Sequence, residues 1–496
     1  MSFLQRSTRF GINSSQLALA RSVSVTKVAT AVPVDHGMKV CNPKTSTKRE
    51  RVVVLGSGWG GFTVAKNLDP KLYDVTVVSP TGYFTFTPLL ASTSVGTLEF
   101  RTALEPVRRL KNVNLSMARA ESIDFKTQTV TLNSAVPSPA TSSSHSLPPR
   151  AHNKAMTIAP EKHQDERFVV GYDKLVISVG AFSATFGTPG VYEHAHFLKD
   201  IRDARAIRKR ILDCFERASQ PFIKEAEIRA LLAFRIVGGG PTGIEFAAEL
   251  HDLITSDMKR IYPDLVGFST ISLYDVAPGI LLSFEESLRE YAMRRFSRDN
   301  VIVRPNSRVL EVGPGWMEIE GEGKVPFGLL VWSTGLEPNP LIKSISQADK
   351  DPRSQSLFTD NFLRVLDKET GEPMKNVYAI GDNSMIKDGP KLPATAQVAN
   401  QKALNLAANL NNAGTEKPDT EFILRNKGSM VYLGSWRAII DRTATNVSGP
   451  KGEVTGLSAW FLWRSAYWSM SSWRNRLLMS VYWGMNLITG RDISRF

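Results

Sequence analysis

Short apolar, β-branched runs alternate with helical patterns along most of the chain. This alternation predicts parallel strands joined by crossover helices. The first unit comprises a strand at 51–55, a helix at 60–68 and a strand at 74–78, and a charged helical run follows at 201–217. Further strands are predicted at 174–179, 271–274, 328–332 and 376–380. We therefore expect an α/β protein in which a second βαβ domain is inserted into the first.

Two glycine-rich turns lie 182 residues apart, each after an apolar run and before a helical pattern. The first carries Gly56, Gly58 and Gly61, and the second carries Gly238, Gly240 and Gly243. At this spacing the first glycine permits a tight turn, the second admits a pyrophosphate, and the third lets helix and strand pack closely. One copy is a weak signal, but two copies in this context predict two bound dinucleotides.

The residue that ends the second strand differs between the two units. Ser79 can make one ribose hydrogen bond and does not repel a phosphate, so the first turn suits a resident FAD. Asp275 can accept both ribose hydroxyls and repel a 2′-phosphate, which favours NADH over NADPH. An acid that only caps the following turn is the alternative for Asp275.

Three further positions are candidates for chemistry. The Gly381-Asp382 pair follows a predicted strand and could hold the ribityl hydroxyls of a flavin. Gln397 could lie against the pyrimidine edge of the flavin, unless this stretch is only a helix start capped by Thr395. Glu245 either benefits from the helix dipole or contacts the nicotinamide end of the cofactor.

The net charge of +13 is concentrated at the two ends of the chain. Residues 1–49 carry eight Lys and Arg against Asp35 alone, with many Ser and Thr, which is typical of a mitochondrial transit peptide. A disordered basic tail is the alternative. The body is close to neutral, so we expect no nucleic-acid-binding face.

The chain has few cysteines: after Cys41 only Cys214 remains. This argues against a redox-active dithiol and against cysteine-ligated metals, and we predict no metal site.

Residues 456–496 contain five of the nine tryptophans, interspersed with arginines. No apolar run reaches 18 residues, so this segment predicts a helical pair lying in the headgroup plane of a membrane. A dimer interface or a core helix pair is the alternative. Separately, the Ser- and Pro-rich stretch at 134–160 predicts a flexible surface insertion.

The chain resembles the type II (alternative, rotenone-insensitive) NADH:ubiquinone oxidoreductases of mitochondria, and is most similar to fungal members. The segments that carry the resemblance are GSGWGG (56–61), the run SPTGYFTFTPLL from Ser79, VGA (179–181), FGTPGV (186–191), GGGPTGIE (238–245), YAIGD (378–382), ATAQVANQ (394–401) and GRDISRF (490–496). The resemblance implies two Rossmann-type domains of the glutathione-reductase-like kind and a C-terminal membrane-surface domain. Its implied parts are a leader (1–49), an FAD-binding domain (50–233 and 346–430), an NADH-binding domain (234–345) and a C-terminal domain (431–496).

The resemblance also implies the activity, a non-pumping transfer of a hydride from NADH to non-covalent FAD and of two electrons to ubiquinone. The expected FAD contacts are Gly56, Gly58, Gly61, Ser79, Thr87, Pro88, Gly180, Gly381, Asp382, Ala396 and Gln397. The expected NADH contacts are Gly238, Gly240, Thr242, Gly243, Glu245, Asp275 and Gly335, and the expected catalytic residues are Glu245, Gln397 and Gln401. No calcium-binding loop is expected, because the chain has no DxDxDG motif.

Two other kinds of flavoprotein share this architecture. A sulfide:quinone oxidoreductase needs cysteines near the flavin, and an apoptosis-inducing-factor-like protein needs a basic body. We expect a peripheral protein of the mitochondrial inner membrane, with the matrix side favoured because no stop segment follows the leader. A homodimer through the C-terminal helices stays open.

Overall fold

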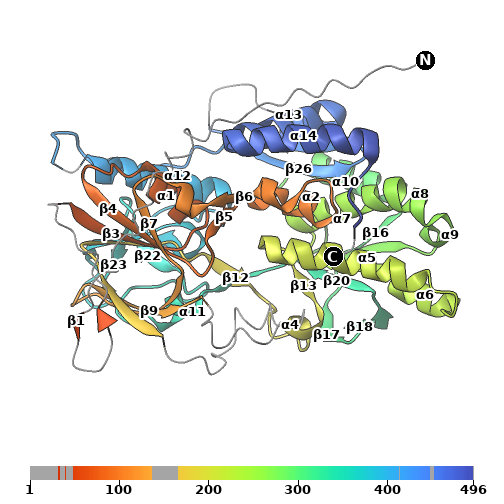
Figure 1. Ribbon diagram of the computed structural model, residues 1–496, viewed down its shortest axis with the longest axis horizontal. Helices are drawn as coiled ribbons and strands as arrows, with labels where there is room; N and C mark the ends of the chain where they lie inside the picture. The colour runs from red at the N-terminus through yellow and green to blue at the C-terminus, as the bar shows by residue number, and fades with distance from the viewer. Residues whose placement is uncertain are drawn as a thin grey trace, which may run out of the picture.

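The computed structural model describes residues 32–33, 39–40, 49–136, 166–412, 414–446 and 452–494. These residues form two α/β halves that lie side by side, with two C-terminal helices across one side (Figure 1). Most of the predicted leader and of the predicted insertion at 134–160 falls outside the described residues.

The first half is built on an eight-stranded sheet in the order β25-β22-β23-β24-β11-β3-β4-β7. Its central strands are parallel: β24 (Pro373–Ala379), β11 (Lys174–Ile177), β3 (Glu50–Leu55), β4 (Tyr73–Val78) and β7 (Val113–Ser116). Beyond β24 the sheet continues through β23 (Arg364–Leu366) and β22 (Leu357–Thr359) to the edge strand β25 (Ser384–Ile386).

Residues 52–55 of strand β3 are apolar because both faces of the strand are covered there. Val52 and Val54 pack toward α1 (Trp59–Asn67) and α12 (Ala396–Asn411). Val53 and Leu55 pack toward a second sheet of β8 (Ala118–Asp124), β9 (Thr129–Ser134) and β10 (Arg167–Gly171). Two short strands from the predicted leader, β1 (Val32–Pro33) and β2 (Lys39–Val40), extend the edge of this sheet beside β10.

The second half has a parallel sheet in the order β13-β20-β14-β15-β16. Its strands are β13 (His196–Phe197), β20 (Leu329–Trp332), β14 (Ala233–Val237), β15 (Thr270–Tyr274) and β16 (Val301–Arg304). Helices α5 (Ile201–Ala218) and α7 (Pro241–Leu253) pack in its core. This half therefore includes residues before 234, because strand β13 of its sheet precedes that position.

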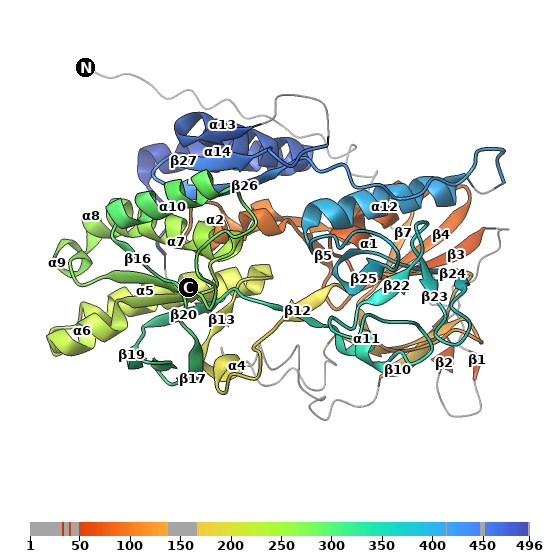
Figure 2. The same ribbon diagram turned by 180° about the vertical axis from the view of Figure 1, so that it is seen from behind.

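The two halves are joined by an antiparallel pair, β12 (Ala181–Ser183) and β21 (Leu336–Pro338). Figure 2 shows β12 running between the halves as the chain enters the second one. The chain thus leaves the first half and returns to it through adjacent strands, as the inserted-domain pattern predicts.

The C-terminal part consists of a three-stranded sheet and a helical pair. The strands are β26 (Ser429–Gly434), β27 (Arg437–Asp441) and β28 (Glu453–Thr455), and the helices are α13 (Gly456–Met470) and α14 (Trp473–Thr489). Strand β26 packs on α7, and α13 packs on β27. In the part of the chain that the structure describes, no helix combines the length and apolarity needed to cross a bilayer.

Candidate active site

Each glycine turn has two positions where the fold itself requires glycine. Gly56 and Gly238 have φ angles of +103° and +117°, which side-chain-bearing residues rarely adopt. A Cβ on Gly61 or Gly243 would lie 2.0 Å from the carbonyl oxygen of Gly56 or Gly238, respectively. These four glycines therefore allow the strand, the turn and the helix to pack closely, as predicted.

Gly58 and Gly240 are different, because a Cβ on either would meet no atom within 4 Å. They are the N-cap residues of α1 and α7. As glycines they have no side chain that could cap the helix. Open space at a helix N-terminus with unpaired N–H groups is the environment that a pyrophosphate occupies. Both turns therefore fit a dinucleotide, and Thr242 is exposed on the first turn of α7.

Ser79 and Asp275, which follow the second strand of the first and the second unit, have different surroundings. Ser79 is buried, and its hydroxyl lies 2.9 Å from that of Ser57. Asp275 Oδ1 accepts a hydrogen bond of 2.8 Å from the N–H of Ala277, and Oδ2 accepts one from the N–H of Gly239. Asp275 thus caps the following turn, which was the alternative interpretation, and at the same time lies against the second glycine turn.

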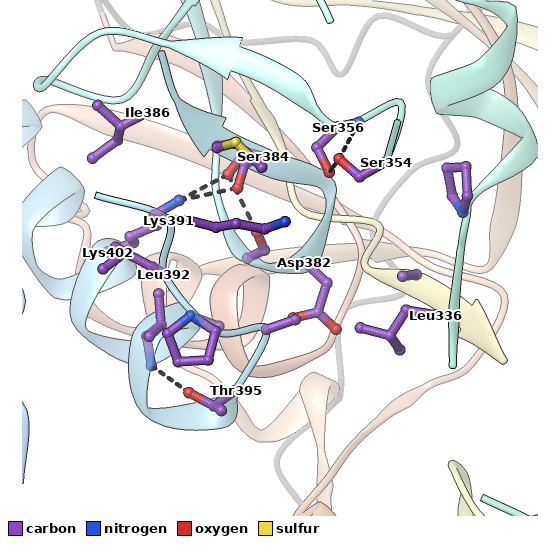
Figure 3. Close-up of a pocket in the computed structure, with 18 of the residues that line it drawn as sticks. Leu336, Ser354, Ser356, Asp382, Ser384, Ile386, Lys391, Leu392, Thr395 and Lys402 are labelled. Carbon is purple, nitrogen blue, oxygen red and sulfur yellow. Dashed lines mark hydrogen bonds between the residues drawn. The ribbon is translucent and has the colours of Figure 1, made fainter. Parts of the chain in front are cut away.

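A cavity of about 270 Å³ lies beside Asp382, at the end of β24 (Figure 3). Asp382 sits in a short turn, η6 (Gly381–Asn383), and the N–H of Gly180 donates to Oδ1 of Asn383 at 3.1 Å. This bond brings the expected flavin contacts Gly180, Gly381 and Asp382 to one place.

The floor of this cavity holds Lys402, whose Nζ donates to both the carbonyl and the hydroxyl of Ser384 at 3.2 Å. Burial lowers the pKa of Lys402 to about 8, although the Asp382 carboxylate acts in the opposite direction. Sequence reasoning missed Lys402, because a lysine in an amphipathic helix is ordinarily on its solvent face.

The predicted FAD contacts Thr87 and Pro88 lie in η1 (Thr87–Leu89), and Ala396 begins α12. Thr87 Oγ1 accepts a hydrogen bond of 3.0 Å from Nε1 of Trp59 at the start of α1. The turn is thereby held next to the first glycine turn. Gly335, with φ of +73°, immediately precedes β21 at the junction of the halves.

Gln397 and Gln401 lie one turn apart on α12, and both hold the segment that leads into the C-terminal sheet. Gln397 Oε1 accepts from the N–H of Lys427 at 2.7 Å. Gln401 makes two bonds with the backbone of Arg425, at 2.9 and 3.0 Å. Thr395 caps the helix by accepting from the N–H of Val398, as the alternative interpretation has it. Neither glutamine is among the residues that line the cavity beside Asp382.

Glu245 lies just beyond the first turn of α7, with its side chain directed toward the C-terminal part. Its Oε1 accepts hydrogen bonds from the N–H of Tyr432 at 3.2 Å and from Nε1 of Trp463 at 3.1 Å. Burial raises the pKa of Glu245 to about 8. The sequence did not point to either donor, because both reach Glu245 from elements about 190 and 220 residues away.

The C-terminal helix α13 also contacts the first half. The ring of Tyr467 packs on Phe86, with centroids 6.1 Å apart, and Phe86 packs on Trp59 at 5.1 Å. Phe86 directly precedes Thr87, so α13 lies beside the expected flavin contacts.

The described residues contain no group of three or more His, Cys, Asp or Glu side chains that could hold a metal ion.

Comparison with known proteins assigns the family. Residues 50–403 match the model of the pyridine nucleotide-disulphide oxidoreductases, and residues 426–492 match that of the NDH2 C-terminal domain. The chain belongs to the pyridine nucleotide-disulphide oxidoreductase family. This confirms the predicted fold class, and the second match confirms that a distinct C-terminal domain follows the dinucleotide-binding halves.

Relatives of this oxidoreductase match along nearly their whole length. A "Probable NADH dehydrogenase" of Dictyostelium discoideum is 37% identical over 90% of this chain and 92% of its own. An "Internal alternative NAD(P)H-ubiquinone oxidoreductase A1, mitochondrial" of Solanum tuberosum is 36% identical over 91% and 89%, respectively. An "External NADH-ubiquinone oxidoreductase 2, mitochondrial" of Saccharomyces cerevisiae is 34% identical over 90% and 82%.

Among solved structures, NDH2 from Plasmodium falciparum in complex with NADH superposes with a TM-score of 0.78 at 27% identity. The match covers 90% of this oxidoreductase and 100% of that chain. A sulfide:quinone oxidoreductase from Aquifex aeolicus matches at 17% identity with a TM-score of 0.62, which shows the fold alone.

Proposed function

We propose that this chain is a type II NADH:ubiquinone oxidoreductase, which passes a hydride from NADH to non-covalently bound FAD and then two electrons to ubiquinone. The observation that carries the proposal is the pair of open glycine turns, one in each half, together with a cavity beside Asp382 that β12 and β21 help to line. Relatives named as NADH or NAD(P)H-ubiquinone oxidoreductases support the substrates.

The first half would hold FAD through the open turn at Gly58, the buried hydroxyl of Ser79 and the carboxylate of Asp382. The second half would hold NADH through Gly240, Thr242 and Asp275. FAD supplies the two-electron chemistry, and the protein supplies placement and electrostatics. Hydride transfer needs no obligatory acid–base pair on the protein, so the principal task of these residues is to align the two rings.

Ubiquinone would reach the flavin between α12 and α13. Gln397 and Gln401 on α12 hold the segment that leads into the C-terminal sheet, and Tyr467 on α13 packs on Phe86, which directly precedes Thr87. The glutamine amides fix the 425–428 segment to α12 and would form one wall of this route.

The outer face of the helical pair supports attachment to a membrane surface. Large apolar side chains on α13 and α14 are exposed, namely Leu457, Phe461, Leu462, Trp468, Met470, Trp473, Leu477, Val481, Met485 and Ile488. An exposed apolar patch with arginines and tryptophans suits the headgroup region of a bilayer. We place the protein on the mitochondrial inner membrane, on the matrix side.

The sidedness can be tested by protease treatment of intact mitochondria. Protection of the protein, with digestion only after the outer and inner membranes are opened, is expected for the matrix side. Digestion after opening the outer membrane alone would indicate the face of the inner membrane opposite to the matrix. The word "External" in one relative's name implies that face for that protein.

Turnover tests the activity itself. Purified protein loaded with FAD should oxidise NADH rapidly with a short-chain ubiquinone, and sulfide should not replace NADH as the electron donor. Negligible turnover in fully loaded protein would overturn the proposal. Cys214, the one cysteine after Cys41, is buried in α5, so the described residues offer no pair of thiols for sulfide chemistry.

A further inference from the structure

The cavity beside Asp382 is lined by two elements that are expected to hold the flavin. One is the turn after β24, residues 381–384, and the other is the start of α12, residues 395–399. Lys402 lies one turn further along α12 and also lines the cavity (Figure 3). Its side chain extends from α12 to the turn, so it joins the two elements.

Hydrogen bonds hold this turn to two parts of the fold. The ammonium group of Lys402 donates to the carbonyl oxygen and to the hydroxyl oxygen of Ser384, at 3.2 Å each. The hydroxyl of Ser384 in turn donates to the carbonyl oxygen of Gly381 at 3.3 Å. Separately, Nδ2 of Asn383 donates to the carbonyl oxygen of the last residue of β11 at 3.1 Å. Asp382 is thus carried by a turn that is held to both α12 and β11.

The Lys402 side chain is buried, which is unusual for a lysine. Its exposed fraction is 2%, whereas a lysine in an amphipathic helix ordinarily extends its ammonium group to solvent. Enclosing a cation is more costly than two hydrogen bonds to uncharged acceptors can offset. The Asp382 carboxylate favours the charged form of Lys402, but burial acts more strongly and lowers the pKa to about 8. An apolar side chain of similar length would be less costly here, so the lysine indicates a role for its donors and its charge.

We propose that Lys402 is a positioning residue for FAD, which ties the Asp382 turn to α12 at the separation that the ribityl chain and the ring of the flavin require. The inference rests on the proposed placement of FAD beside Asp382. In that placement Asp382 accepts a hydrogen bond from a ribityl hydroxyl, and the start of α12, with its free N–H groups, receives the ring. Lys402 acts on these contacts through Ser384 rather than by touching the flavin.

Loss of the Lys402 ammonium group should affect the turn rather than the fold. Asn383 still ties the turn to β11, and the neighbouring Ala403 and Leu406 of α12 belong to an apolar cluster that does not include Lys402. A methionine at position 402 would keep most of the buried apolar volume and adapt to the space. The measurable consequence is therefore a looser Asp382 turn and a faster loss of FAD.

The test measures release of FAD from the holoenzyme, followed by the rise of flavin fluorescence after dilution. Lys402→Met should release FAD at least about tenfold faster than the wild type, because two hydrogen bonds that hold the turn are lost. Lys402→Arg keeps the charge and the donors, and the cavity has room for the longer side chain, so its rate should stay within about threefold of the wild type. The matched control is Lys387→Met, just after β25, because Lys387 is 42% exposed and pairs with Asp349 instead.

A second comparison asks whether Lys402 acts through Asp382. Asp382→Ala alone should release FAD faster than the wild type, and adding Lys402→Met to it should change the rate less than about twofold. Fully additive effects would overturn the proposal. A wild-type rate in Lys402→Met, with fast release in Asp382→Ala, would overturn it too but leave the placement of FAD intact. A wild-type rate in Asp382→Ala would instead overturn the placement of FAD, and this inference with it.

A third variant decides the case in which Lys402→Met retains no FAD on purification. Lys402→Gln is then compared with Lys402→Arg, because glutamine keeps N–H donors without the charge. Retention of FAD in either variant would support the requirement for a donor at this position. Loss of FAD from both would show that the lysine only fills space, and would overturn the proposal.

Discussion

Trp463 on α13 donates its indole N–H to Oε1 of Glu245 on α7 at 3.1 Å. The N–H of Tyr432 donates to the same oxygen at 3.2 Å. Two donors on one carboxyl oxygen leave the other oxygen to carry a proton, which agrees with a pKa that burial raises to about 8. The C-terminal domain is thus attached to the second half through a carboxyl group that is neutral below about pH 8.

The first prediction concerns the pH dependence of stability. Native Glu245 keeps its proton up to about pH 8, whereas an unfolded glutamate loses it near pH 4.3. Between these values the native state binds more protons, so its stability falls as pH rises. Glu245→Gln keeps the acceptor and does not titrate. Its thermal midpoint minus that of the wild type should therefore increase from pH 5 to pH 8 in differential scanning fluorimetry.

The control for this experiment is Glu245→Ala, which removes the acceptor for both N–H donors. It should be destabilised at pH 5 as well as at pH 8, by about 1–3 kcal/mol for each donor left unpaired. A midpoint difference between Glu245→Gln and the wild type that stays constant with pH would show that Glu245 is ionised in the native protein.

Much of this site could be predicted from the sequence because its signals are local. The spacing of Gly56, Gly58 and Gly61 defines a strand, a turn and a helix within one short segment, and Asp275 ends the next strand of its own unit. The partners of Glu245 could not be predicted, since they depend on how a distant sheet and helix pack on α7. Lys402 was missed for the same reason, because only the packing of α12 encloses its ammonium group.

The open glycine positions lead to a second prediction. Gly240→Val should raise the KM for NADH at least about tenfold while FAD content stays normal, because the added side chain occupies only the pyrophosphate space. Gly58→Val should instead lose FAD. The matched variant Gly61→Ala places its Cβ 2.0 Å from the Gly56 carbonyl and should impair folding itself. Steady-state kinetics and flavin absorbance measure these effects, and loss of FAD in Gly240→Val would contradict the assignment.

The third prediction concerns Asp275 and the choice of nucleotide. Its carboxylate lies against the second glycine turn, where it would meet the ribose hydroxyls and repel a 2′-phosphate. Asp275→Ser removes the charge and should narrow the kcat/KM preference for NADH over NADPH by about tenfold or more. The change should come mainly from a higher KM for NADH. A ratio equal to that of the wild type would mean that another residue recognises the ribose.

A fourth prediction addresses how the C-terminal tail is held. Arg491 Nη1 lies 2.7 Å from Oδ2 of Asp257, and Arg491 Nε donates to Thr97 at 2.9 Å. The Arg491 and Asp257 side chains are only 14% and 6% exposed, so Arg491→Ala removes the close, enclosed partner of a buried carboxylate. The expected cost is about 3–5 kcal/mol. Amide hydrogen exchange across α14 should accelerate accordingly.

The neighbouring Arg260 is the matched control for that experiment. Its side chain is 64% exposed and lies 3.9 Å from the same Asp257, so Arg260→Ala should cost less than about 1 kcal/mol. Equal exchange rates in α14 of Arg491→Ala and Arg260→Ala would contradict a role for Arg491 in holding the tail.

The last prediction concerns the exposed face of α13 and α14. Trp473 and Ile488 are 79% and 86% exposed, and burial of each in the headgroup boundary is worth about 1.5 kcal/mol or more. Replacing both with Glu should reduce binding to anionic liposomes roughly a hundredfold. Phe222→Glu, which changes a 66% exposed residue near the end of α5, should bind like the wild type. If liposome binding of the double variant is unchanged and a dimer dissociates instead, this face is a subunit interface rather than a membrane surface.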